Sequence, residues 1–144
     1  MPVEFETLVC TREMFRPYRI DGLRWWAADE WEAAYKAYEG VWPDSTPWSR
    51  ADWDELYSQG YRYCSVLRNG KAVASAGLWP RTNEEWEVIA VGTAPEFRNQ
   101  GYGKAIVSFV TETILESGRD ATIGFRESNT PMRRTAVALG YEVR

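Results

Sequence analysis

The sequence predicts a mixed α/β fold, with a mostly antiparallel central sheet flanked by helices. Two stretches of the 144-residue chain support this prediction. Trp86–Ser117 has the pattern of a strand, a glycine-bearing loop and a helix, and Tyr61–Trp79 has the pattern of two strands joined by a tight turn. Strands and helices alternate only in the second half of the chain, so a mixed rather than a parallel sheet is expected.

The strand, loop and helix of the first stretch follow from residue types. Glu87–Thr93 alternates and is rich in β-branched residues, and Pro95 ends this strand because proline cannot donate to a sheet ladder. Apolar residues then recur at helical spacing from Tyr102 onward. Gly101 and Gly103 therefore stand where a helix begins.

The first part of the chain holds two candidate strands, Val3–Cys10 and Leu23–Trp26. A helix is expected between an N-cap at Asp29 and Gly40, because apolar and aromatic residues follow at helical spacing. We expect a single domain over residues 1–144, in which residues 1–20 are an N-terminal extension.

The middle of the chain carries two clear local signals. Ser49 and Asp52 have the spacing of a capping box that opens a second helix, and Asn69-Gly70 is typical of a type I′ hairpin turn. With the strand before the glycine loop, this hairpin predicts a three-strand antiparallel meander. Ala121–Phe125 is expected to be a further strand, and a last helix follows Asn129.

Two glycines at a helix start indicate an anion site. The first amides of a helix have no partner within it, its N-terminus carries a partial positive charge, and glycine lets the backbone approach a ligand. Arg98 and Lys104 add full charges, so the loop predicts a pyrophosphate cradle. The dinucleotide fingerprint requires a glycine where Ile106 stands, and the P-loop requires one at position 98, so neither fits.

The motif Arg98-x-x-Gly101-x-Gly103 resembles the acetyl-CoA loop of the GNAT superfamily of N-acetyltransferases. The resemblance includes Glu87 at the family's interval before the loop, the Pro-Glu-Phe that precedes Arg98, Asn129, and a Gly-Tyr pair ending at Tyr141. Before Glu87 the resemblance is limited to the order of strands and helices. It implies a sheet that is splayed between its fourth and fifth strands.

The resemblance implies that acetyl-CoA is the cosubstrate, and no metal is expected. In the family, strand amides hold the pantetheine chain, and one of them faces the thioester oxygen as an oxyanion-type contact. The loop holds the pyrophosphate, and the asparagine lies at the sulfur end, although Asn129 is equally well explained as a plain helix N-cap. The implied cofactor-binding residues are Val91, Gly92, Thr93, Arg98, Asn99, Gln100, Gly101, Tyr102, Gly103, Lys104 and Asn129.

Glu87 is the candidate general base. An amine arrives protonated and must lose a proton, directly or through a water, and a carboxylate in a partly buried cleft suits that task. The alternative is that Glu87 merely faces solvent on a half-exposed strand. The position of the family's usual general acid, a tyrosine, is Ala136 here. Tyr141, Cys64 and Ser128 are unranked substitutes, and a CoA thiolate is a fair leaving group without an acid.

Trp42 and Trp48 lie in a proline-bearing loop between two helices. In the family this segment lines the acceptor cleft, so the two are candidates for an aromatic wall against a cationic amine. A loop held in place by its own aromatic residues explains them equally well.

Arg133 or Arg134 could reach a ribose phosphate, but a solvated helix face is the more ordinary explanation.

Composition narrows the function classes. The net charge is −4 with no basic tract, which disfavours a nucleic-acid surface, and no apolar run approaches a membrane span. The sequence has no histidine, which excludes imidazole catalysis and histidine-bound metals. Cys10 and Cys64 lack metal-site spacing, and a reduced compartment is the default. The N-terminus does not resemble a signal peptide, so a cytoplasmic location is expected.

The expected function is transfer of an acetyl group from acetyl-CoA to a primary amine by direct attack. The alternative is a non-catalytic acyl-CoA-binding or sensing module, supported by Ala136 and by the absence of the family's final strand. Because an open sheet edge invites aggregation, Val3–Cys10 is expected to fill that position. It would do so in cis or from a second subunit, so a homodimer is among the expected partners.

Overall fold

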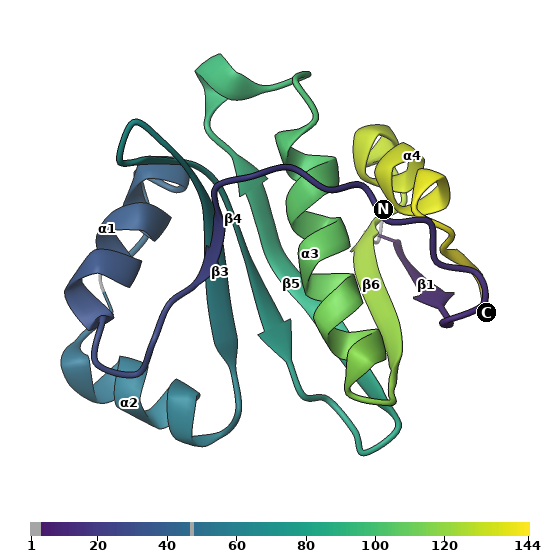
Figure 1. The fold of residues 1–144 in the computed structure, drawn as a ribbon, viewed down its shortest axis with the longest axis horizontal. Coiled ribbons are helices and arrows are strands. Elements are labelled where there is room, and N and C mark those ends of the chain that lie inside the picture. Colours follow the sequence, from purple (N-terminus) through teal and green to yellow (C-terminus); the bar gives the residue numbers. More distant parts are fainter. Residues whose placement is uncertain (1–3, 47) are drawn as a thin grey trace.

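One seven-stranded sheet runs through the protein, with helices packed against it (Figure 1). The structure, a computed structural model, describes residues 4–46 and 48–144. Its elements in chain order are β1 (Phe5–Cys10), β2 (Leu23–Trp25), α1 (Trp31–Val41), α2 (Arg50–Ser58), β3 (Arg62–Arg68), β4 (Lys71–Trp79), β5 (Glu85–Thr93), the 3₁₀ turn η1 (Pro95–Phe97), α3 (Tyr102–Glu116), β6 (Asp120–Arg126), α4 (Thr130–Ala138) and β7 (Glu142–Val143).

The strand order is β2-β3-β4-β5-β6-β1-β7, and every neighbouring pair is antiparallel except β5 and β6. This confirms the predicted mixed, mostly antiparallel sheet. The meander of β3, β4 and β5 turns at Asn69 (φ 53°) and Gly70 (φ 75°), the two positive φ angles of a type I′ turn. The predicted capping box of α2 is also present, with Ser49 and Asp52 bonded reciprocally.

The parallel pair separates halfway along β5. Pairing with β6 runs from Glu85, opposite Asp120, to Val88, opposite Ile123, and then stops. The rest of β5, Ile89–Thr93, pairs with β4 alone. This is the splay expected between the fourth and fifth family strands, and it leaves one backbone edge of β5 without a strand partner.

Two apolar clusters cover the sheet. The larger one packs α3, through Ile106, Val110 and Ile114, against sheet residues that include Val88 and Ile123. The smaller cluster packs Ala34 and Ala37 of α1 and Trp53 of α2 against Trp26 and Ala72. The two clusters hold the end of α1 and the start of α3 in fixed positions relative to β5.

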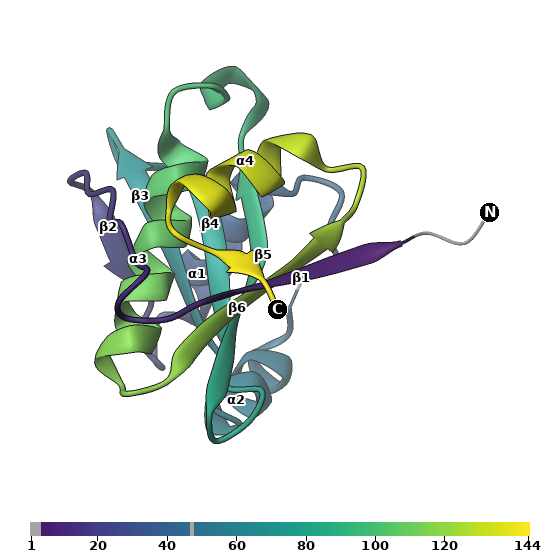
Figure 2. The same cartoon turned by 90° about the vertical axis from the view of Figure 1, so that its right-hand side faces the viewer.

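The N-terminal strand β1 lies inside the sheet, between β6 and β7 of the same chain (Figure 2). It pairs with β6 along its whole length, and Leu8 and Val9 pair with β7 on the other side. Leu8 and Cys10 are buried in the larger cluster. The strand is therefore supplied in cis and is internal, while β7 forms the edge. Val3, the expected start of this strand, lies outside the described residues.

Candidate functional site

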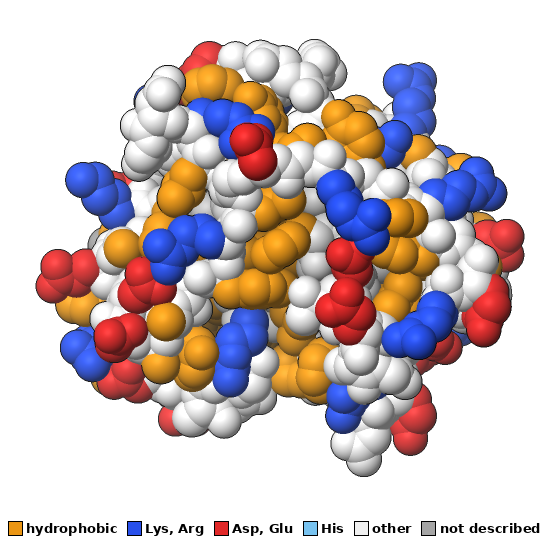
Figure 3. Space-filling model, in the orientation of Figure 1, with side chains coloured by type: hydrophobic (Ala, Val, Ile, Leu, Met, Phe, Trp, Pro, Cys, Tyr) orange, Lys and Arg blue, Asp and Glu red, His pale blue; other side chains and the backbone are white. Residues whose placement is uncertain are grey.

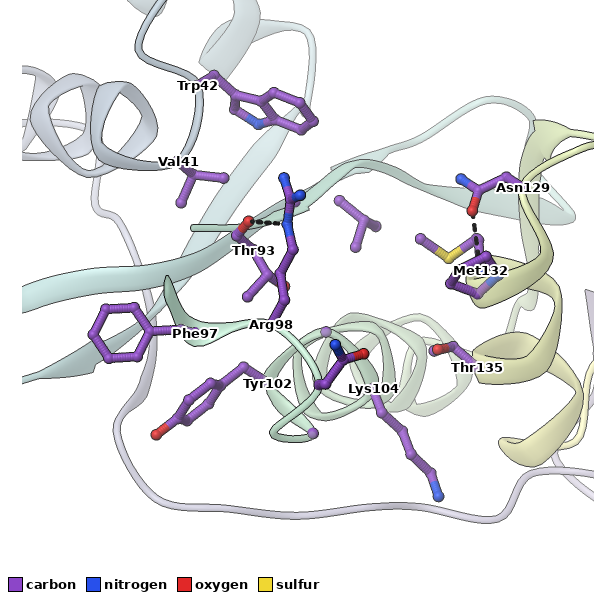
Figure 4. A pocket seen from close by; sticks show the side chains of 16 residues that line it. Val41, Trp42, Thr93, Phe97, Arg98, Tyr102, Lys104, Asn129, Met132 and Thr135 are labelled. Atoms are coloured by element: carbon purple, nitrogen blue, oxygen red, sulfur yellow. Dashed lines mark hydrogen bonds between the residues drawn. The ribbon is translucent and has the colours of Figure 1, made fainter. Parts of the chain in front are cut away.

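A cavity of about 490 Å³ opens beside the part of β5 that no longer pairs with β6. Its walls come from the end of α1, the end of β5, the loop before α3 and the first turn of α4, and Figure 4 shows their side chains around one hollow. All but one of the cofactor-binding residues expected from the sequence line it, namely Val91, Gly92, Thr93, Arg98, Asn99, Gly101, Tyr102, Gly103, Lys104 and Asn129.

The exception is Gln100, whose side-chain amide instead donates to the Glu96 carbonyl at 3.4 Å. Sequence reasoning also missed some lining residues, among them Val41 and Met132. Met132 and Thr135 follow Asn129 at intervals of three residues, which places all three on one side of α4. That helical spacing could have identified Met132 and Thr135 as cavity residues from the sequence.

The two loop glycines serve different purposes. Gly101 is the N-cap of α3 with φ 88°, and a Cβ atom there would lie 2.7 Å from the Tyr18 hydroxyl, so its conformation and its surroundings both require glycine. Gly103 is helical, and a Cβ atom would lie 3.4 Å from Thr93 Oγ1. Its missing side chain leaves the first turn of α3 open to the cavity.

The loop is positively charged. Arg98 reaches from the loop into the hollow, where its Nε donates to the Thr93 carbonyl at 3.3 Å (Figure 4). Lys104 points elsewhere, and its Nζ lies 4.8 Å from the centre of the Tyr18 ring. Among the described residues neither cation has a carboxylate within ion-pair distance. Together with the unpaired amides at the start of α3, they make a cradle suited to an anion.

Asn129 faces this loop across the cavity (Figure 4). Its Oδ1 accepts a hydrogen bond from the Met132 amide at 3.2 Å, so it is the N-cap of α4. The cap uses only the acceptor of the side chain, which leaves the Nδ2 donor for a ligand. The two roles considered from the sequence are therefore compatible in this geometry.

Of the two loop tryptophans, only Trp42 lines the cavity. Its ring lies so close to Gly92 that a Cβ atom there would be 2.4 Å from Trp42 Cζ2. Trp48 packs instead among aromatic rings, with centroids 4.7 Å from Tyr38 and 4.9 Å from Tyr63. Its position matches the packing interpretation, and it does not line this cavity.

Glu87 lies on β5, four residues before Val91, and does not line this cavity. Its side chain is 19% exposed. The Thr122 hydroxyl donates to Glu87 Oε1 at 3.1 Å, and Arg81 Nε lies 3.7 Å from the same oxygen. The carboxylate is therefore held on a half-buried strand rather than free in solvent.

None of the considered substitutes for a general acid lines the cavity. Tyr141 is 1% exposed and shares a 2.6 Å hydrogen bond with Thr111, and burial raises the pKa of its hydroxyl. Ser128 is exposed outside the lining. Ala136 is fully buried. Arg133 forms an ion pair with Glu6 of β1.

Cys10 and Cys64 are both buried outside the lining. Burial is the main cause that raises the pKa of Cys10 to about 11, and Asp120 and Glu142 raise it further. Burial also raises the pKa of Cys64. Both thiols are thus kept protonated, which disfavours a covalent acetyl-cysteine intermediate.

We expect both cysteines to resist iodoacetamide at pH 8 in the native protein and to react fully in urea.

The raised pKa of Cys10 implies that its contribution to folding stability is complete below about pH 8.5 and declines as the pH rises through about 11. Unfolding free energies measured from pH 8 to 11 should therefore fall less steeply for Cys10→Ala than for the wild type. An equal fall in unfolding free energy for the variant and the wild type would contradict the raised pKa of Cys10.

The splayed sheet and the cavity beside it match the fold that the sequence resemblance implies, and comparison with protein families agrees. The model of the acetyltransferase (GNAT) family matches residues 20–141, so the chain belongs to this family. No curated protein sequence matches it significantly.

Solved structures share the fold at low identity. A GNAT-family protein from Novosphingobium aromaticivorans is 19% identical with a TM-score of 0.70, over 98% of this chain and 61% of the other. A GNAT acetyltransferase from Colwellia psychrerythraea is 14% identical with a TM-score of 0.78, over 99% and 53%. The ribosomal-protein-S18-alanine N-acetyltransferase from Escherichia coli is 20% identical with a TM-score of 0.62, over 83% and 76%. This chain thus spans little more than half the length of the first two.

Two kinds of feature are absent from the described part of the chain. Within residues 4–46 and 48–144, no helix combines the length and the apolar composition needed to cross a bilayer. In the same part of the chain, no three His, Cys, Asp or Glu side chains form a group that could hold a metal ion.

Proposed function

We propose that this protein is an acetyl-CoA-dependent N-acetyltransferase that acts on a primary amine. One observation carries the proposal: a single cavity joins the open amides at the start of α3 to the edge of β5 that β6 has left. The first feature suits a pyrophosphate, and the second suits an extended chain that forms backbone hydrogen bonds. A CoA thioester has both parts.

In this arrangement the pyrophosphate lies on the loop, near Gly101, Gly103 and Arg98. The pantetheine chain runs along Val91–Thr93, and a β5 amide faces the thioester oxygen as it gains charge. The amine nitrogen attacks the thioester carbon, the carbon–sulfur bond breaks, and CoA leaves as the thiolate. Glu87 accepts the proton of the amine, directly or through a water.

A non-catalytic acyl-CoA-binding module is the second candidate, favoured by the buried Ala136 at the usual position of the general acid. The two functions differ in turnover. An enzyme releases free CoA thiol from acetyl-CoA only when a suitable amine is added, and we expect this result from a panel of small amines, amino acids and peptides. Stabilisation by acetyl-CoA with no amine-dependent thiol release would instead indicate a sensor.

Gly103→Asp is expected to abolish binding of acetyl-CoA while leaving the protein folded. The helical position accommodates a Cβ atom, and an acidic residue in the first turn of a helix is favourable, but its charge repels a pyrophosphate. At a hundredfold excess over Kd, acetyl-CoA should stabilise the wild type by about 2.7 kcal/mol and the variant hardly at all. Thermal unfolding with and without acetyl-CoA measures the stabilisation of the wild type and of the variant.

The control for Gly103→Asp is Arg50→Gln, which makes the same change in net charge on the exposed surface of α2. This variant should keep the full shift. A Gly103→Asp protein that acetyl-CoA still stabilises would show that the glycine loop is not the pyrophosphate site.

Trp42→Ala is expected to raise the KM for a cationic amine by about 2- to 30-fold, the range given by a cation–π contact of about 0.5–2 kcal/mol. Trp42 is 38% exposed, so its removal costs some stability, and the kinetics are measured at a temperature where thermal unfolding shows the variant to be folded. Steady-state kinetics gives the KM, and thermal unfolding with acetyl-CoA serves as the control for cofactor binding. An equal loss of affinity for acetyl-CoA would assign Trp42 to the cofactor half of the site instead.

A further inference from the structure

A second cavity, of about 550 Å³, lies at the other end of β5 and α3. It takes Trp86 from the start of β5 and Thr113 from the later turns of α3, and it shares no lining residue with the first cavity. Figure 3 shows a face of the protein with hydrophobic side chains in a strip down the middle and both basic and acidic side chains beside it. The volume is typical of a small-molecule site.

The walls of this second cavity are mostly apolar, and four of the lining residues are aromatic. They include Trp25, Trp26, Tyr57 and Trp86, with the buried Leu78 from β4. Trp25 is held in place by the Phe109 ring of α3, at a centroid distance of 5.3 Å. Flat apolar ligands suit such walls, because aromatic rings prefer offset or edge-to-face packing against one another.

Arg62 is the cation in this wall, and the protein holds it in one orientation. Its Nη1 donates to the carbonyls of Tyr57 at 2.9 Å and Tyr61 at 2.7 Å, and its Cζ lies 3.6 Å from the centre of the Tyr57 ring. Among the described residues, neither its Nε nor its Nη2 has a hydrogen-bond or ion-pair partner. These two groups form the edge of a guanidinium that binds a carboxylate through parallel hydrogen bonds.

Two further arginines stack on wall residues. Arg119 lies 4.0 Å from the centre of the Trp86 ring and donates to the Asn83 carbonyl, with no ion-pair partner among the described residues. Arg24 lies 4.3 Å from the centre of the Trp26 ring, but Glu30 neutralises it. Arg62 and Arg119 are therefore two cations at the cavity wall that have no ion-pair partner among the described residues, although the protein as a whole carries a net charge of −4.

We propose that the second cavity binds a small organic carboxylate with a flat apolar body, such as an aromatic acid. The ring lies between the tryptophans, and the carboxylate pairs with the free edge of Arg62. Because that guanidinium is already ordered, little side-chain entropy is lost on binding. The site is independent of the acetyl-CoA cavity and of the proposed acetyl transfer.

Calorimetric titration with three naphthalene probes tests this proposal, since they share one ring system and differ in charge. We expect saturable binding of one 2-naphthoate per protein, at least about 10-fold weaker binding of neutral 2-naphthalenemethanol, and no binding of 2-naphthylmethylamine. Arg62→Met should weaken 2-naphthoate about 10-fold or more and leave the alcohol unchanged. The matched control is Arg50→Met, which removes an exposed arginine that pairs with Asp54 and does not line this cavity, and it should leave 2-naphthoate binding unchanged.

Two further variants separate the sites and guard against misfolding. Thr113→Phe fills the second cavity from α3 and should abolish 2-naphthoate binding while acetyl-CoA still stabilises the protein. Gly103→Asp should keep full 2-naphthoate binding. Equal affinity for the acid and the alcohol, no effect of Arg62→Met, or no saturation at millimolar 2-naphthoate would each overturn the proposal.

Discussion

Replacing Glu87 with glutamine is expected to lower kcat for amine acetylation by about 10²- to 10⁴-fold, the usual contribution of a positioned base. Glutamine keeps the size of the side chain and an oxygen that can accept from Thr122, but it cannot take up a proton. The loss should therefore appear in kcat, while acetyl-CoA still stabilises the variant against heat. Steady-state kinetics with the best amine of the panel measures it.

The structure supports Glu87 as the base because only one of its two oxygens is engaged. Oε1 accepts from the Thr122 hydroxyl and lies nearest Arg81. Oε2 has no hydrogen-bond partner among the described residues. Arg81 is itself held by Glu85 at 2.8 Å. The carboxylate is thus fixed through one oxygen and can accept a proton at the other.

Glu84→Gln is the matched control for Glu87→Gln, because it makes the same chemical change at an exposed position of the preceding turn. It should leave kcat and KM unchanged. If Glu87→Gln retains the wild-type kcat across the pH range, Glu87 is not the base, and the proton leaves directly to water.

The glycine loop could be predicted from sequence because its chemistry is local. Gly101 needs a positive φ to begin α3, and Arg98 stands within one turn of it, so neighbours in sequence determine the geometry. The same holds for the type I′ turn at Asn69-Gly70 and for the capping box at Ser49. In each case the residues that form the contact lie within a few positions of one another.

The side of the cavity that comes from the end of α1 could not be predicted in the same way. Trp42 and Trp48 lie in one loop, and which of them reaches the cavity depends on distant residues. Tyr63 from β3 holds the ring of Trp48, whereas Gly92 from β5 leaves room for that of Trp42. Sequence spacing carries no information about such contacts, because the partners come from separate strands.

The start of α1 shows a similar effect at smaller scale. Asp29 was expected to cap this helix, but the N-cap is Glu30, and no side chain caps it. The Glu30 carboxylate instead accepts from the Ala27 amide at 2.7 Å and pairs with Arg24 of β2. An ion pair with a neighbouring strand thus replaces the local capping pattern.

The expectation that Val3–Cys10 joins the sheet is confirmed for Phe5–Cys10, which lies beside β6 of the same chain, but the addition of β7 on its other side could not be predicted. The weak alternation of Val3–Cys10 indicated a strand without giving its neighbours. Pairing of β1 with β6 joins residues more than a hundred positions apart, such as Leu8 and Ile123. The short β7 then adds to the outer side of β1, so that the extension becomes an internal strand.

Leu8→Ala is expected to destabilise the protein by about 2–5 kcal/mol, a large part of the roughly 5–15 kcal/mol that holds a domain folded. Leu8 is 1% exposed and belongs to the cluster that α3 covers. Its loss leaves a cavity between β1 and the helices that the rigid sheet cannot close. Urea unfolding followed by tryptophan fluorescence gives the free energy.

Phe5→Ala is the control for Leu8→Ala, because it removes a larger apolar side chain from the same strand at a position that is 69% exposed. It should cost little stability, since most of that side chain stays in contact with water in the folded state. A large loss for Leu8 with a small loss for Phe5 would mean that β1 contributes to the core as an internal strand. Similar small losses for both would mean that the sheet is stable without β1, and that the extension is only an added cover over β6.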